Sequence, residues 1–111
     1  MKIPNKIRVA GHNYKVFFDD KYLDKEKILG QCDFISQKIR LCKKFKKQVR
    51  AKSDIDRTFY HEIIHAIDGH YNNYALKEKE VGRLANGLYQ VLADNFIVKI
   101  KKGGWVNAIQ K

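Results

Sequence analysis

The segment His61-Glu62-Ile63-Ile64-His65 constrains the fold most, because it lies within a pattern that only a helix satisfies. Ser53 is a typical helix N-cap residue and Gly69 a typical stop signal. Between them, apolar residues recur at every fourth position and would form one buried stripe, consisting of Ile55, Phe59, Ile63 and Ile67. We therefore expect a helix over residues 53–70 that presents its histidines on another face.

The two histidines of this segment predict a metal site. His61 and His65 lie one helical turn apart, so their imidazoles project side by side. Two imidazole nitrogens in this arrangement suit one zinc ion, at ~2.0–2.1 Å each. Glu62 adjoins His61 and is placed to take a proton from a water molecule on the metal. The motif predicts a zinc-dependent peptidase with one zinc ion as cofactor, His61 and His65 as ligands, and Glu62 as catalytic base.

A catalytic zinc site of this kind needs a third protein ligand and one open position. We expect this third ligand to come from a second helix over residues 76–102. The buried face of that helix would contain Val81, Leu84, Ala85, Leu88, Val91 and Leu92. Glu78 and Glu80 are the glutamates that follow the motif in its first turns. Glu78 continues the buried stripe and is the preferred ligand, with Glu80 as the alternative.

The region 1–52 reads as β-rich. Residues 6–10 and 13–18 are rich in Ile, Val, Tyr and Phe, with Gly11-His12 suited to a hairpin turn between them. A second β-like region begins at Gly30, and Ser36-Gln37 is a turn candidate within it. We expect an α+β fold of one metallopeptidase-like domain, residues 1–111, in which a small antiparallel sheet precedes two main helices and residues 103–111 form a tail.

Two further parts of an active site can be assigned from sequence position. His70 and Tyr71 follow the motif and are candidate hydrogen-bond donors to a tetrahedral intermediate, as are Tyr60 and Tyr74. The segment 37–42, represented by Ile39, Arg40 and Leu41, is the candidate edge strand for an extended peptide substrate.

Charge suggests a second type of partner. The formal net charge is +11, and residues 43–52 contain a concentrated run of lysines, so the surface is a candidate for nucleic-acid binding. The chain begins without the apolar run of a secretory signal and has no segment of roughly 20 apolar residues, so no membrane partner is expected. We expect a cytoplasmic protein with Cys32 and Cys42 as free thiols. The sequence makes no prediction of oligomeric state.

The segments Thr58–Ile67 and Glu78–Leu92 together resemble the small phage- and prophage-type metallopeptidases, which are similar to the ImmA/IrrE and SprT-like minimal gluzincins. Gly30 and the strands after it resemble the usual lead-in to the motif helix. The resemblance implies zinc, ligands at His61 and His65, a catalytic Glu62, a glutamate ligand mapping onto Glu78, and a bacterial or phage origin. One position departs from the pattern, because Gly82 stands where gluzincins often carry an acidic residue.

Overall fold

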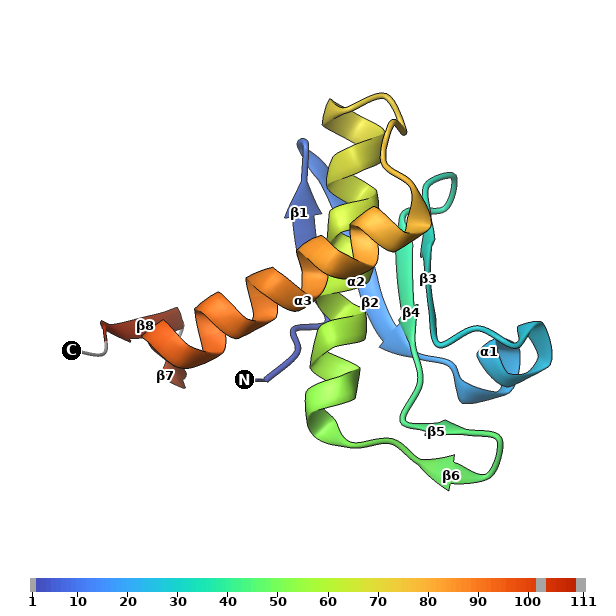
Figure 1. Cartoon of the computed structure of the whole chain (residues 1–111), viewed down its shortest axis with the longest axis horizontal. Helices are drawn as coiled ribbons and strands as arrows, with labels where there is room; N and C mark the ends of the chain where they lie inside the picture. Colours follow the sequence, from blue (N-terminus) through green and yellow to red (C-terminus); the bar gives the residue numbers. More distant parts are fainter. Residues whose placement is uncertain (1, 102–103, 110–111) are drawn as a thin grey trace.

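Alternating apolar residues in the N-terminal part of the chain form a four-stranded sheet (Figure 1). The computed structural model describes residues 2–101 and 104–109, with side-chain packing described as far as Phe96. The strands of the sheet are β1 (Lys6–Val9), β2 (His12–Phe18), β3 (Gly30–Asp33) and β4 (Lys38–Leu41). Ala10 and Gly11 form the β1–β2 turn with positive φ, one residue earlier than expected. The α+β fold class is confirmed.

The sheet is mixed rather than antiparallel, and its strand order is β1-β2-β4-β3. β2 and β4 pair in parallel, whereas β1 with β2 and β3 with β4 pair antiparallel. The helix α1 (Asp20–Glu26) leads from β2 to β3, and β3 then turns back into β4. The Asp33 carboxylate accepts hydrogen bonds from the Ile35 and Ser36 N–H groups in that turn. This double reversal places β4 inside the sheet and leaves β1 and β3 as its edges.

Helix α2 (Lys52–Tyr71) packs against one face of the sheet. Phe59 and Ala66 lie in a common core with Tyr14, Ile39 and Leu41. The expected stripe holds at Ile55 and Phe59 but is wrong at Ile67, which is exposed. Positions four apart rotate by about 40° around a helix with 3.6 residues per turn, so a long i+4 series leaves the buried face.

Helix α3 (Glu78–Asn95) crosses α2 near its own first turns and then runs away from the sheet (Figure 1). Val81 and Ala85 are buried against α2, whereas Leu84 and Val91 are exposed. The expected buried face is therefore wrong at Leu84 and Val91, whereas Leu88 and Leu92 are half-buried. The buried positions Val81 and Ala85 are four apart and share a helical face, and Leu84 lies to one side of it.

The C-terminal helix expected to reach residue 102 ends at Asn95, and the expected tail contains a strand. β7 (Phe96–Lys101) pairs antiparallel with β8 (Gly104–Ile109). The sequence Phe96-Ile97-Val98 begins β7 with an aromatic and two β-branched residues, which favour a strand over a helix. Residues 102–103 and 110–111 lie outside the described residues.

The lysine-rich segment before α2 forms a small hairpin, β5 (Lys44–Phe45) and β6 (Gln48–Val49). Lys46 and Lys47 both have positive φ at its turn. Cys32 and Cys42 are free cysteines. Among the helices described, none combines the length and apolar character that crossing a membrane requires.

Candidate metal centre

His61 and His65 lie on the face of α2 that meets α3, because both contact Glu78 in the first turn of α3. Both side chains are about three-quarters buried, and their ring centroids are 4.9 Å apart. The i, i+4 spacing produces this proximity, because both residues occupy the same helical face. The sheet-facing apolar residues of α2 lie on another side, so the histidines are free of the core.

Glu78 meets both histidines from the first turn of α3. Its Oε1 atom is 2.5 Å from His61 Nε2, and its Oε2 atom is 3.0 Å from His65 Nε2. A ligand atom from each of the three side chains lies within 4.8 Å of the others. Two imidazole nitrogens and one carboxylate oxygen are a donor set that a divalent metal such as zinc accepts, with a further position left open. The residues therefore fit a metal.

Glu80, the alternative third ligand, has a different role. Its Oε1 atom accepts a hydrogen bond from the Lys77 N–H at 2.7 Å, as part of a capping box that begins α3. This bond satisfies one of the backbone N–H groups that a helix start leaves without a partner. The structure brings Glu78, and not Glu80, to the histidines.

Glu62 lies beside this cluster but is 5% exposed. Burial, and then the negative charge of Glu78, raise the pKa of the Glu62 carboxyl to about 8. A Cβ atom added at Gly30 would lie 3.0 Å from Glu62 Oε2 and 2.6 Å from Thr58 Cγ2. Glycine at the start of β3 is therefore what allows this strand to approach the Glu62 carboxylate closely.

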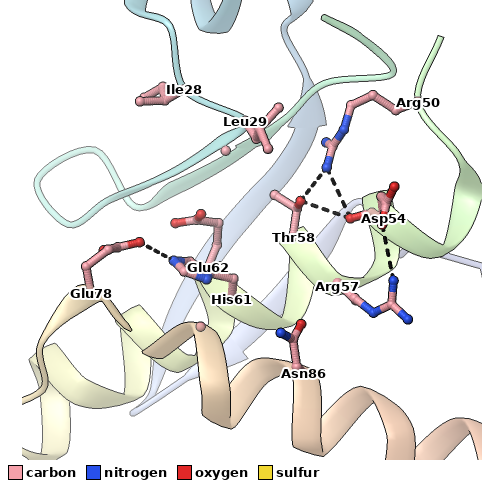
Figure 2. Close-up of a pocket in the computed structure, with 12 residues that line it drawn as sticks. Ile28, Leu29, Arg50, Asp54, Arg57, Thr58, His61, Glu62, Glu78 and Asn86 are labelled. Carbon is pink, nitrogen blue, oxygen red and sulfur yellow. Dashed lines mark hydrogen bonds and ion pairs between the residues drawn. The ribbon is translucent and has the colours of Figure 1, made fainter. Parts of the chain in front are cut away.

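A cleft of about 620 Å³ opens in front of these side chains (Figure 2). Its rim on the strand side is Ile28-Leu29-Gly30, and His61, Glu62 and Glu78 lie at one end. Gly82 of α3 also lines the cleft, and a Cβ atom added at Gly82 would lie 3.9 Å from His61 Cε1. The cleft is large enough for several residues of an extended peptide.

The expected oxyanion donors His70 and Tyr71 do not line the cleft. His70 Nε2 is 2.6 Å from the Tyr14 hydroxyl, and the His70 ring stacks on His12 at 4.8 Å. Tyr71 is exposed at the end of α2. Five residues beyond His65 correspond to about 140° of rotation around the helix, which turns His70 toward the sheet. Tyr60 is buried, and Tyr74 packs on Phe34.

The expected substrate edge strand is wrong as well. Ile39 and Leu41 are fully buried, and their strand β4 pairs with β2 on one side and β3 on the other. The backbone of Arg40 is therefore already used within the sheet. β3 is the edge strand beside the cleft, since its first residue, Gly30, forms part of the rim.

Sequence reasoning missed the polar residues at the other end of the cleft. Arg50, Asp54, Arg57 and Thr58 line it from the start of α2 and the residues before it, and Asn86 lines it from α3. The sequence did contain a signal for the α2 residues. Positions 54, 57, 58, 61 and 62 follow the spacing i, i+3, i+4, i+7 and i+8, so they lie on one face of the helix.

Comparison of the chain with protein-family models, with curated proteins and with solved structures found no match.

Proposed function

We propose that this protein is a zinc-dependent metallopeptidase that hydrolyses peptide bonds in a protein substrate, similar to the minimal gluzincins. The convergence of His61, His65 and Glu78, with Glu62 beside them, is the observation that carries the proposal. These side chains come from two helices that meet at the rim of a cleft, where a substrate has access.

Each residue of the centre has a separate task in this proposal. His61 and His65 bind the metal through Nε2, and Glu78 binds it through a carboxylate oxygen, since these are the atoms that face one another. When bound, zinc supplies a Lewis acid that polarises a peptide carbonyl and makes a water molecule more acidic. Glu62 would take a proton from the attacking water on a carboxylate oxygen as the water oxygen bonds to the peptide carbon, and would pass it to the leaving amine as the C–N bond breaks.

The edge strand β3 is the proposed binding site for the substrate main chain. An extended peptide can add to a free sheet edge by backbone hydrogen bonds, which hold it with little dependence on its side chains. β3 meets this requirement because, among the described residues, β4 is the one strand that pairs with it. A peptide paired there would cross the cleft in front of Glu62, next to Gly30.

The test combines metal analysis with peptide cleavage. We expect about one zinc ion per chain by elemental analysis in the wild type and in Glu62→Gln, and much weaker retention in His65→Ala. Cleavage of a peptide library should fall by roughly a hundredfold or more in Glu62→Gln, because only the proton transfer is removed.

The outcomes separate the proposal from its nearest alternative. A wild-type protein that binds no stoichiometric zinc contradicts the metallopeptidase proposal. Zinc binding without cleavage of any library member indicates a non-catalytic zinc-binding module instead. A cleavage rate equal in wild type and Glu62→Gln contradicts the role of Glu62.

A second candidate function is association with nucleic acid. The observation in its favour is the β5–β6 hairpin, which carries Lys44, Lys46 and Lys47, with no acidic residue between positions 43 and 53. A hairpin of one charge sign that projects from the molecule is suited to contact phosphate groups. The two functions are compatible, since the hairpin lies apart from the metal centre.

A further inference from the structure

The end of the cleft away from the metal centre is built mainly from charged side chains (Figure 2). Arg50, Asp54, Arg57 and Thr58 gather there, opposite Asn86 of α3. The metal-site proposal assigns no task to any of these residues. Their position at the end of the same cleft raises the question of which part of a substrate they would meet.

The charges at this end do not cancel. Arg57 pairs with Asp54, with Nη1 and Oδ1 3.1 Å apart. Arg50 instead donates to neutral groups, namely the Cys42 carbonyl, the Asp54 carbonyl and the Thr58 hydroxyl, the last at 2.7 Å. Within the described residues no carboxylate pairs with Arg50. Two guanidinium groups thus face one carboxylate, and a surplus positive charge remains at this end of the cleft.

Arg57 is held in place and still has donors to offer. Its side chain is 45% exposed, and its guanidinium lies over the Tyr89 ring at 4.9 Å. The ion pair with Asp54 engages one of its nitrogens, so other N–H groups of the planar fork are available to a ligand. A planar guanidinium with free donors is well suited to bind a carboxylate.

The distance between Arg57 and His61 along α2 relates this end of the cleft to the metal centre. Arg57 precedes His61 by four residues, which is about 6 Å along the helix axis. An extended peptide advances about 3.3 Å per residue, so two residues span roughly the same distance. A peptide whose scissile bond faces Glu62 would therefore place a side chain about two residues away near Arg57.

We propose that the Arg50–Arg57 end of the cleft binds an acidic side chain of the substrate, about two residues from the scissile bond. The preferred substrate is thus an acidic segment of a protein. This inference rests on the proposed peptidase function, and it adds the substrate class. Arg57 contacts the carboxylate, Arg50 supplies the unneutralised charge, and Asp54 limits the preference by offsetting part of that charge.

The experiment compares two fluorescent peptides that differ only in Glu or Gln at the positions two residues from the cleaved bond. Binding to zinc-loaded Glu62→Gln protein is measured by fluorescence anisotropy, and cleavage is measured with zinc-loaded wild type. We expect the Glu peptide to bind about tenfold more tightly and to be cleaved with a correspondingly higher kcat/KM.

Variants of the two paired residues should change the preference in opposite directions. In the Glu62→Gln background, Arg57→Gln should bring the Glu-to-Gln affinity ratio close to one. Asp54→Asn should raise the ratio several-fold, because it removes the competing carboxylate. Arg8→Gln is the matched control: it removes the same charge from exposed β1, at the opposite edge of the sheet, and should leave the ratio unchanged.

The outcomes distinguish this inference from the proposed function. Zinc-dependent cleavage with equal use of both peptides contradicts the inference alone, whereas absence of zinc binding contradicts the proposed function. A ratio that falls equally in Arg57→Gln and Arg8→Gln also contradicts the inference, since it reflects overall charge. Circular dichroism of each variant establishes folding. Should Arg57→Gln fail to fold, Asp54→Asn decides, and a ratio that it leaves unchanged contradicts the inference.

Discussion

At the scale of single residues, burial decides how two ionisable groups behave. Glu62 and Tyr14 lie on different sides of α2, the first beside the metal centre and the second in the core. Burial raises the pKa of the Glu62 carboxyl to about 8 and the pKa of the Tyr14 hydroxyl to about 12. In both cases the neutral form is favoured, because a charge loses its hydration when the side chain leaves water.

The raised pKa of Tyr14 predicts how the stability of the protein changes at alkaline pH. Well below pH 10, the ordinary pKa of a tyrosine, the hydroxyl is protonated in both folded and unfolded chains, so its contribution to stability is constant. Between pH 10 and about 12 the unfolded chain loses this proton while the folded chain keeps it, so stability falls as pH rises. We expect this to remove roughly 1–3 kcal/mol from the wild type.

Denaturant titrations of wild type and Tyr14→Phe at several pH values measure this contribution. At neutral pH, Tyr14→Phe should be less stable by about 1 kcal/mol, because the hydrogen bond to His70 is lost. The difference should shrink and then reverse above pH 10, since phenylalanine has no proton to lose. A difference that stays constant across this range would show that Tyr14 ionises normally in the folded protein.

At the scale of elements, α2 joins the core to the metal centre through two of its faces. Phe59 and Ala66 contact the sheet, while His61 and His65 meet α3. The strand β3 can lie close to the same helix because Gly30 lacks the Cβ atom that would overlap Thr58 and Glu62. The distance between β3 and α2 therefore determines both the packing and the shape of the cleft.

Two glycine-to-alanine substitutions test this close approach with the same chemical change. Gly30→Ala should lower the free energy of unfolding by about 1–3 kcal/mol, because the added methyl overlaps Thr58 and Glu62. Gly87→Ala, in exposed α3 with no atom within 4 Å of its added Cβ, should raise it by about 0.5–1 kcal/mol. Urea denaturation midpoints measure both effects. Equal shifts of the denaturation midpoint in the two variants would contradict the close approach of β3 to α2.

At the scale of the whole molecule, the formal net charge of +11 acts at long range. It attracts acidic partners of any kind, whether an acidic protein segment or a nucleic acid. The β5–β6 hairpin concentrates part of this charge, and the arginine end of the cleft concentrates another part. The two sites adjoin at Arg50, whose N–H donates to the Lys43 carbonyl at the base of the hairpin, so their contributions are separated by substituting different residues.

Salt dependence measures the contribution of the hairpin. Binding to double-stranded DNA, followed by anisotropy at several salt concentrations, should weaken steeply as salt rises, because bound counterions are released. Replacing Lys44, Lys46 and Lys47 by Gln should make the slope of log K against log salt shallower by about two to three. The matched control replaces Lys6, Lys15 and Lys79, exposed lysines of β1, β2 and α3, and should have a smaller effect. Absence of DNA binding at low salt would exclude this candidate function.

Local patterns were sufficient for parts of the chain whose structure depends on near neighbours. The helix around His61 and His65, the β-rich start and the turn at Ser36-Gln37 follow from periodicity and turn chemistry within a few residues. The same patterns failed where packing partners decide the outcome. Ile67 and Leu84 have the spacing of core residues, but in the described part of the chain their side chains remain exposed to solvent.

The sequence by itself determined that the histidines at positions 61 and 65 share a helical face with Glu62 next to them, because helical geometry follows from local spacing. The tertiary structure decided that Glu78 faces them while Glu80 caps α3, that β3 rather than β4 is the free edge beside the cleft, and that Arg57 lies at its far end. Each of these depends on how elements distant in the sequence cross or pair. Such arrangements arise from burial of surfaces between elements, which no local pattern encodes.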